Sequence, residues 1–449
     1  MIQKRILILF LMLNNFGIVF GQSGFQFPKE SDRSYTMRFQ LINNLIVVPV
    51  EVNKTKLSFI LDTGVQKNIL FSLSGKDSLG LNNVKKVSLY GLGNGNEIEA
   101  LLSHFNEIKV GDLKSRGQSL YVILNDQFEL SGKMGITIHG IIGYQLFKDV
   151  IAKINYKTKK ITFYNPKNYR YKTCRKCEVF SIEFYRDKPY IDIGVQLDTI
   201  GNEEIPIKIL VDSGGSDALW LFENSKERIR TPLRYFNAIL GEGLSGTIYG
   251  NKSRIPKVKL GKFEITQPTV SFLDTLTTYR ARKFEERNGS IGGNLLKRFK
   301  VWIDYPNKKI TLKKNASFSG GFEYDMSGID ILYNGEELVK ELETKKVVDF
   351  ASRDVTNNST VFFSTNYHYK FMPFYKVSNV LKDSPAEKAG ILPGDVLLKF
   401  NGVAVYKYSI GEIIQKLQQK EGKRIRLMIR RGGIEGRILK FQFRLKKRI

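Results

Sequence analysis

The sequence predicts a mainly β protein in which two similar β lobes are followed by a smaller α+β unit. Three observations support this prediction: a repeated segment around two Asp-Ser/Thr-Gly triplets, strand patterns in both copies, and helix signals near the C-terminus. The chain has 449 residues, 42% hydrophobic and 26% charged, which is typical of folded domains. At about 150 residues per domain, this length suits three folded units.

Residues 1–21 have the pattern of a secretory signal peptide. Two basic residues come first, a mostly apolar run follows, and Gly21 is a small residue at a suitable cleavage point. The run is shorter than the roughly 20 residues of a membrane span, and two adjacent asparagines interrupt it. We therefore expect export to the periplasm or the extracellular space, with residues 22–35 as an N-terminal linker.

Two segments repeat one pattern, in which an apolar run is followed by Asp, then Ser or Thr, then Gly. Residues 57–71 read LSFILDTGVQKNILF, and residues 207–221 read IKILVDSGGSDALWL. A second pair matches without a gap: residues 140–163 read GIIGYQLFKDVIAKINYKTKKITF, and residues 289–312 read GSIGGNLLKRFKVWIDYPNKKITL. One such triplet is common by chance, but two copies with the same partner segment indicate a duplicated unit.

Each copy has the composition of β-strands separated by turns. Apolar and β-branched residues dominate runs such as 45–52 and 205–211. We expect lobe 1 over residues 36–168, an inter-lobe linker over 169–178, and lobe 2 over 179–316.

Asp62 and Asp212 are the candidate catalytic residues. Each follows an apolar strand at a tight turn, and a pseudo-twofold relation between the copies would bring the two turns face to face. Two carboxylates that close cannot both ionise cheaply, so the pair would share a proton. Such a pair supplies a general base for water and a general acid for an amide. The rest of each triplet would support the loops: Thr63, Gly64, Ser213 and Gly214.

The paired triplets resemble the signature sequences of bilobal aspartic peptidases with a pepsin-like or retropepsin-like plan. Apolar-apolar-Gly segments are similar to those that pass behind each catalytic loop in that family: Ile142, Gly143, Ile291 and Gly292. Glycine-rich hairpins fall where the family has flaps over the substrate: Tyr90, Gly91, Gly93 and Gly243. Tyr90 can equally be a plain strand tyrosine.

The resemblance implies an aspartic endopeptidase that cleaves extended peptide or protein substrates in the cleft between the lobes. Water activated by Asp62 and Asp212 would attack the peptide bond, with neither cofactor nor metal. Val65 and Gly215 stand where pepsins usually have Ser or Thr, so the family's pH optimum does not carry over. Two alternatives stay open: structural Asp turns without activity, and a non-catalytic exported scaffold that binds peptides.

Residues 320–449 are similar to a PDZ domain, with an insertion at about 334–370, and the whole chain resembles exported bacterial aspartyl proteases that end in such a domain. Residues 384–390 carry the signals of a short capped helix, and Ser409 begins a second one. The resemblance implies a carboxylate-binding loop at Ser327, Gly328 and Ile329, and an edge strand that can pair with a partner's C-terminal peptide. Alternatively, this region is a linker and the loop lies elsewhere.

Cys174 and Cys177 lie between the lobes, and the chain has no other cysteine. A zinc site would need two more ligands, so a local disulfide is expected in an oxidising compartment, with two reduced thiols as the alternative. The three histidines lie far apart, which argues against a histidine-built zinc site or serine-hydrolase chemistry. The net charge of +27 favours anionic partners. Nucleic acid is not expected for an exported protein, but an anionic envelope surface stays open as a partner.

Overall fold

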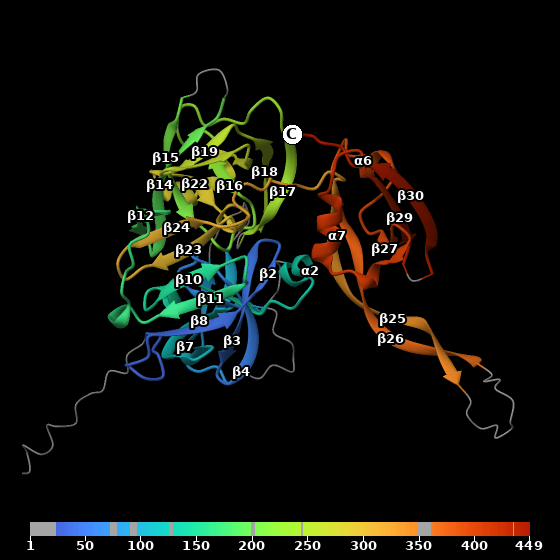
Figure 1. Ribbon diagram of the computed structural model, residues 1–449, viewed down its shortest axis with the longest axis horizontal. Helices are drawn as coiled ribbons and strands as arrows, with labels where there is room; N and C mark the ends of the chain where they lie inside the picture. The colour runs from blue at the N-terminus through green and yellow to red at the C-terminus, as the bar shows by residue number, and fades with distance from the viewer. Residues whose placement is uncertain are drawn as a thin grey trace, which may run out of the picture.

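The computed structural model describes residues 24–71, 79–89, 97–124, 129–198, 203–243, 246–348, 361–433 and 435–449. The described chain forms two β lobes and a third unit beside them (Figure 1). The expected signal peptide lies outside the described residues. Within these ranges, no helix has both the length and the apolar character needed to cross a membrane.

Lobe 1 is built on one sheet with the strand order β2-β3-β4-β9-β5-β8-β7-β6. Its central feature is the parallel pair of β4 and β9, in which Leu61 lies opposite Ile142. Apolar side chains of these strands are buried, so the turn after β4 starts from a fixed position. The elements are β2 (Gln40–Ile42), β3 (Leu45–Val52), β4 (Thr55–Leu61), β5 (Asn68–Leu70), β6 (Lys85–Leu89), β7 (Ile98–Val110), β8 (Leu113–Val122), α2 (Leu130–Met134), β9 (Gly140–Ile142) and α3 (Tyr144–Phe147).

Lobe 2 repeats this arrangement in the order β17-β18-β21-β16-β22-β15-β14-β19-β20, with β13 paired to β14. Its parallel pair is β15 and β22, in which Val211 lies opposite Ile291. The elements are β13 (Glu183–Tyr185), β14 (Lys188–Gln196), β15 (Ile205–Val211), β16 (Leu219–Phe222), β17 (Phe236–Gly243), β18 (Gly246–Arg254), β19 (Lys257–Leu260), β20 (Phe263–Thr266), β21 (Thr269–Leu273), α4 (Thr275–Thr278), η2 (Ala281–Lys283), β22 (Arg287–Ile291) and α5 (Gly293–Leu296).

A third sheet joins the lobes in the order β1-β11-β10-β23-β24-β12. Its centre is the antiparallel pair of β10 and β23, which come from the two copies of the gap-free repeat. One hydrophobic core runs through both lobes and this sheet, which makes them one packed body. This architecture confirms the prediction of two pseudo-symmetric β lobes. The elements are β1 (Ser34–Arg38), β10 (Ile151–Asn155), β11 (Lys160–Tyr164), η1 (Pro166–Asn168), β12 (Cys177–Ser181), β23 (Phe299–Asp304) and β24 (Lys309–Lys314).

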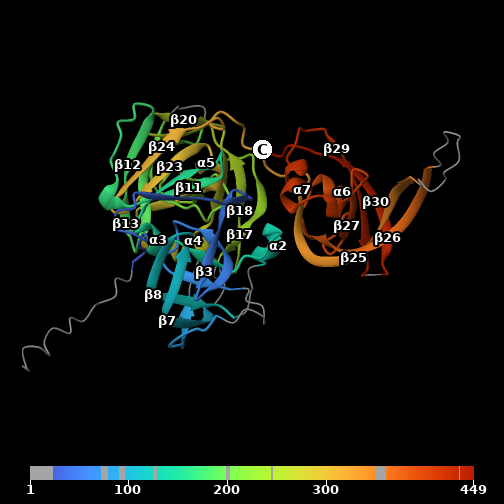
Figure 2. The same ribbon diagram turned by 60° about the horizontal axis from the view of Figure 1, so that its bottom comes forward.

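The third unit has its own sheet, β25-β26-β27-β29-β30 with β28 at the side, and its own hydrophobic core. Most of the expected insertion at 334–370 lies along a long hairpin of β25 and β26 that points away from the lobes (Figure 2). Both expected helices form, with Ser384 and Ser409 as their capping residues. The elements are β25 (Ile329–Val348), β26 (Val361–Val380), α6 (Pro385–Lys388), β27 (Val396–Phe400), β28 (Val403–Ala404), η3 (Val405–Lys407), α7 (Ile410–Leu417), β29 (Arg424–Arg431) and β30 (Arg437–Arg444).

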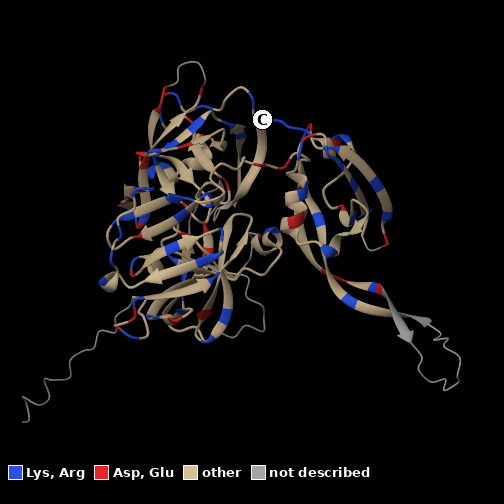
Figure 3. Ribbon diagram, viewed as in Figure 1, with Lys and Arg blue, Asp and Glu red and all other residues tan. Residues whose placement is uncertain are grey.

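Lysine and arginine residues are spread over both lobes and the third unit (Figure 3). Many of them alternate with buried apolar residues along strands, as in β29. The positive charge therefore lies mostly on the solvent faces of amphipathic strands.

Candidate active site

The two aspartates occupy equivalent places in the two lobes. Asp62 follows the last residue of β4, and Asp212 follows the last residue of β15. The backbone N–H of Asp62 donates to the carbonyl oxygen of Ile142 at 2.9 Å, and that of Asp212 donates to Ile291 at 2.9 Å. The apolar-apolar-Gly segments thus lie directly beside the loops that carry the aspartates.

Thr63 and Ser213 tie the two loops together. The N–H of Thr63 donates to Ser213 Oγ at 3.0 Å, and the N–H of Ser213 donates to Thr63 Oγ1 at 2.9 Å. Each hydroxyl then donates to a carbonyl oxygen of the opposite lobe, Thr63 to Val211 at 2.6 Å and Ser213 to Leu61 at 2.8 Å. Because both side chains are fully buried, these four hydrogen bonds fix the distance between the loops.

The glycines of the triplets let the carboxyl groups approach each other. Asp62 Oδ1 accepts a hydrogen bond from Gly64 N at 2.6 Å, and Asp212 Oδ1 accepts one from Gly214 N at 3.0 Å. A Cβ atom placed on Gly64 would lie 3.1 Å from Asp212 Cγ, and one on Gly214 would overlap Asp62 Cγ. The two side chains therefore face each other across the lobe boundary.

The surroundings favour one proton on this pair. Burial raises the pKa of Asp62 well above its usual value, and the charge of Asp212 raises it further. The Gly64 N–H and the Lys188 ammonium act in the opposite direction on this pKa, but they are weaker. Asp62 thus stays protonated in a range of pH where an isolated aspartate would be ionised.

Two residues near the pair escaped the sequence analysis. Lys188 begins β14, and the antiparallel register that sets Tyr190 opposite Leu210 places Lys188 beside Asp212. Burial lowers the pKa of Lys188, and both aspartates act against this shift. The buried Tyr305 hydroxyl donates to the carbonyl oxygen of Thr63 at 3.2 Å. Its place at the same position of the repeat as Tyr156 was the available signal in the sequence.

Symmetrical hairpin turns extend from each lobe to the catalytic loop of the other. Asn44 Nδ2 donates to the carbonyl oxygen of Ser216 at 2.9 Å, and Gln66 Nε2 donates to Asp187 Oδ2 at 2.7 Å. Both turns use residues with positive φ, 47° and 68° at Asn43 and Asn44 and similar values in lobe 2. These two hydrogen bonds connect the lobes on both sides of the aspartate pair.

A cavity of about 1050 Å³ opens beside the pair. Gly214, Gly215 and Ser216 line it directly after Asp212, and Leu45 and Ile141 line it from lobe 1. Its far wall comes from the third unit, including Ile331 of β25. Neither Asp62 nor Asp212 is itself among the lining residues, but Gly214, which packs against the Asp62 carboxyl, brings the cavity next to the pair.

The remaining predicted residues fall in different places. Tyr90, Gly91 and Gly93 lie outside the described residues. Gly243 lies in β17, and it lines the cavity. The structure joins Cys174 and Cys177 in a disulfide.

The carboxylate-binding loop is predicted at the start of β25. Ser327 and Gly328 directly precede this strand, and Ile329 is its first residue. Their backbone N–H groups already have acceptors from the chain itself. Asp325 accepts from Ser327 N at 3.1 Å and from Gly328 N at 2.6 Å, and Ser327 Oγ accepts from Ile329 N at 3.2 Å.

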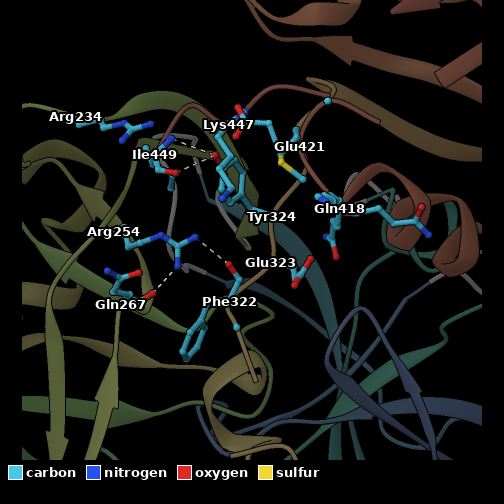
Figure 4. A pocket seen from close by; sticks show the side chains of 15 residues that line it. Arg234, Arg254, Gln267, Phe322, Glu323, Tyr324, Gln418, Glu421, Lys447 and Ile449 are labelled. Carbon is cyan, nitrogen blue, oxygen red and sulfur yellow. Dashed lines mark hydrogen bonds between the residues drawn. The ribbon is translucent and has the colours of Figure 1, made fainter. Parts of the chain in front are cut away.

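A second cavity, of about 930 Å³, lies where the third unit meets lobe 2 (Figure 4). Arg254 donates from its guanidinium to the carbonyl oxygens of Gln267 and Phe322, at 2.5 and 3.0 Å. Tyr324 Oη accepts from Ile449 N at 3.0 Å. The aspartate pair does not contribute to the lining of this cavity.

In a comparison with known families, residues 48–146 and 197–295 each match the aspartyl protease family, and residues 376–431 match the PDZ domain family. The chain thus carries a duplicated aspartyl protease domain followed by a PDZ domain.

Curated relatives share only a short stretch with the chain. A probable CtpA-like serine protease of Staphylococcus saprophyticus is 41% identical over 58 residues, which are 13% of this chain and 12% of that protein. Its counterpart in Staphylococcus haemolyticus is 40% identical over 62 residues, 14% of this chain and 12% of that protein. The chain therefore matches about an eighth of the length of these relatives. Stretches this short cannot include both Asp62 and Asp212.

Among solved structures, the crystal structure of the aspartic proteinase from Irpex lacteus matches with a TM-score of 0.41 and 13% identity. The match covers 64% of this chain and 99% of that one.

Proposed function

We propose that this protein is an aspartic endopeptidase that hydrolyses extended polypeptides. The observation that carries the proposal is the pair of facing carboxyls, Asp62 and Asp212, fixed by hydrogen bonds between the lobes and placed next to a cavity. A pair that holds one proton has an acid and a base within reach of the same peptide bond.

The reaction follows from this arrangement. The ionised carboxylate takes a proton from a water molecule, whose oxygen attacks the carbonyl carbon of the scissile bond. The protonated carboxyl donates its proton to the carbonyl oxygen, which gives a tetrahedral diol. Proton transfer to the amide nitrogen then lets the C–N bond break, and the products are a carboxylic acid and an amine. The pair returns to its singly protonated state.

Hydrogen bonds around the pair support this singly protonated state. The buried bonds of Thr63 and Ser213 hold the carboxyls close, which makes double ionisation unfavourable. The Gly64 and Gly214 N–H groups stabilise negative charge on the Oδ1 atoms of Asp62 and Asp212. The predicted signal peptide and the Cys174–Cys177 disulfide support action in an exported, oxidising location.

The direct test replaces each aspartate by asparagine. Carboxymethylated α-lactalbumin, an unfolded substrate, is incubated with the Asp62→Asn and Asp212→Asn variants at several pH values, and products are identified by mass spectrometry. We expect the cleavage rate of each variant to fall by a factor of about 10² to 10⁴, the usual contribution of acid–base groups. Asp192→Asn is the matched control, because its side chain is 77% exposed on β14.

Two outcomes would contradict the proposal. Undiminished cleavage by both variants would show that the pair is not catalytic, and inhibition by a serine-directed fluorophosphonate would then indicate a serine protease. Saturable peptide binding without any product would instead favour a non-catalytic scaffold.

A further inference from the structure

We propose that the outer face of the sheet in the third unit docks on a bilayer surface that contains anionic phospholipids. Strands β27, β29 and β30 form this face, on the side of the sheet away from α6 and α7. The inference gives the third unit a binding role that does not depend on the proposed peptidase activity.

The first observation is that the strands of this sheet have one apolar and one basic face. In β29, the side chains of Ile425, Leu427 and Ile429 are buried in the same core as residues of α6 and α7. Alternate residues of a strand point to opposite sides, so the even-numbered residues of β29 belong to the outer face. The register of β29 with β27 and β30 adds residues of these strands to the same face. The exposed basic residues of the outer face are Lys399, Arg424, Arg426, Lys440 and Arg444.

The second observation is that the protein itself does not neutralise these five residues. In the part of the chain that the structure describes, none of them forms an ion pair, whereas Arg430 on the same face pairs with Glu337. Arg424 and Arg444 even lie directly opposite each other in the antiparallel ladder. Like charges in this position destabilise a sheet. The outer face therefore carries a repulsion that an anionic surface would relieve.

Protection of a free sheet edge does not account for this pattern. Basic side chains on an edge strand discourage pairing with other chains, and β30 is an edge strand. However, β27 and β29 lie inside the sheet, where both of their edges are already paired. Lys399, Arg424 and Arg426 belong to these inner strands. The basic residues thus cover the face of the sheet as well as its edge.

The third observation is that the outer face points away from the lobes. Both views place α7 on the side of the third unit near the lobes and β30 on the far side (Figures 1 and 2). Figure 3 shows basic residues in blue along β30. None of the five basic residues lines either of the two cavities described above. A surface bound to the outer face would therefore leave the cavity beside the aspartates accessible.

The fourth observation is that apolar side chains lie among these charges. Ile438 lies opposite Arg430 on the outer face, and its side chain is 62% exposed. Val396 and Met428 on the same face are half-buried. A phospholipid surface offers phosphates to basic residues and acyl chains to apolar ones, whereas a soluble polyanion offers charge alone. The anionic bilayer is therefore the partner whose chemistry fits both kinds of side chain.

The basic residues are numerous enough for measurable docking. Each Lys or Arg near an anionic membrane contributes about fivefold to the partition coefficient, and salt screens this contribution. The exposed side chain of Ile438 adds an apolar contact that salt does not remove. We therefore expect strong binding at low ionic strength and weak binding at high ionic strength.

The experiment measures how much of the full-length protein sediments with sucrose-loaded vesicles. Vesicles of phosphatidylcholine alone are compared with vesicles in which about one lipid in three is phosphatidylglycerol. At about 50 mM NaCl, the partition coefficient on the anionic vesicles should exceed that on the neutral ones at least about 100-fold. At about 500 mM NaCl, the two values should lie within about threefold of each other.

Charge reversal separates the outer face from the net charge of the protein. The double variant Arg424→Glu, Arg426→Glu should lower the partition coefficient on anionic vesicles at least about 25-fold. The matched control is Lys85→Glu, Lys86→Glu, which changes the net charge equally at exposed residues of β6 and should lower binding less than about threefold. Arg424→Glu also creates an opposite-charge pair with Arg444, so the third unit should unfold at the same or a higher temperature. Weaker binding of this variant would then not result from unfolding.

Ile438→Ser tests the contribution of the lipid itself. Binding to anionic vesicles should fall about fivefold, because an apolar side chain no longer enters the interface. Soluble polyglutamate, added at the same concentration of negative charge as the vesicles, should not displace the wild-type protein from them.

Any of four results would overturn the inference. Two concern charge: no excess of binding on anionic over neutral vesicles, or equal losses of binding in the two double variants. Two concern the partner: displacement by polyglutamate, which would identify the face as a site for an anionic polymer, or undiminished binding by Ile438→Ser. All four are measured as vesicle binding, so they leave the cleavage test of Asp62 and Asp212 unaffected.

Discussion

At the scale of single residues, the hydroxyls of Thr63 and Ser213 matter as much as the carboxyls they support. Ser213→Ala would leave the N–H of Thr63 and the carbonyl oxygen of Leu61 without their partner in a fully buried place. We expect the free energy of unfolding to fall by about 2–4 kcal/mol, and kcat to fall because the carboxyls separate. Urea denaturation and peptide cleavage measure the two effects.

Thr36→Val is the matched control for this prediction. The hydroxyls of Thr36 and Thr162 form an exposed hydrogen bond of 2.8 Å far from the cleft. Its loss should change stability by less than about 0.5 kcal/mol. A Ser213→Ala variant as stable and as active as the wild type would show that the crossed hydrogen bonds do not hold the pair together.

The charge of Lys188 contributes to the range of pH in which the pair can work. Because the pKa of Asp62 is raised, its proton is present at low pH and is lost as pH rises through that pKa, so activity should decline on the alkaline side. The charge of Lys188 lowers this pKa. Lys188→Met should therefore move the alkaline decline of kcat/KM to higher pH.

The pH profile of Lys188→Met is compared with that of Lys86→Met, which removes an exposed charge from β6. The control should keep the wild-type profile. A shift to lower pH in Lys188→Met, or identical shifts in both variants, would contradict the assigned effect of Lys188 on Asp62.

The sequence could predict the two aspartates but not the lysine beside them. Asp62 and Asp212 belong to a repeat, and repetition implies a symmetrical meeting of the two turns. Lys188 has no counterpart in the repeat, because Leu45 stands at the corresponding position of lobe 1. Its approach to the pair depends on the register of β14 against β15, which hydrophobic patterns do not specify at strand ends.

At the scale of elements, the Gly that ends each apolar-apolar-Gly segment is required because its surroundings leave no space for a side chain. A Cβ atom on Gly292 would lie 2.6 Å from the carbonyl oxygen of Gly215, and one on Gly143 would overlap the backbone of Asp62. Gly292→Ala must therefore displace the catalytic loop of lobe 2. We expect a loss of about 1–3 kcal/mol in stability and at least about tenfold in kcat.

Gly411→Ala provides the comparison, because its Cβ atom would meet no atom within 4 Å in helix α7. Alanine favours helix over glycine, so this variant should be slightly more stable than the wild type. Chemical denaturation and steady-state kinetics of the two variants distinguish crowding at the loop from a general effect of added methyl groups. Full activity in Gly292→Ala would mean that the loop can shift without moving Asp212.

The third unit shows where sequence patterns were insufficient at this scale. Its helices have local signals, such as the capping box of Ser409 and Glu412, and both form as predicted. The long hairpin lacks such a signal: residues 334–348 are rich in Glu and Lys, and their sequence predicts an insertion without indicating a strand. Their strand structure depends on pairing with residues of β26 that lie 13 to 37 positions further along the chain.

At the scale of the whole molecule, the described residues form two main hydrophobic cores. One core extends through both lobes and the sheet between them, whereas the other belongs to the third unit. Ile154 of β10 and Ile413 of α7 are both fully buried, one in each core. Lobes that share a core should unfold together, and the third unit should unfold separately.

Ile154→Ala and Ile413→Ala test this division, because each removes the same atoms from a different core. Each should lower the stability of its own unit by about 2–5 kcal/mol. In calorimetry, Ile413→Ala should shift the transition of the third unit and leave that of the lobes in place. Ile154→Ala should shift the single transition of both lobes, and the loss of short-peptide cleavage should follow that transition, because Asp62 and Asp212 stay together only while both lobes are folded. Separate transitions for the two lobes would show that the central sheet does not make them one unit.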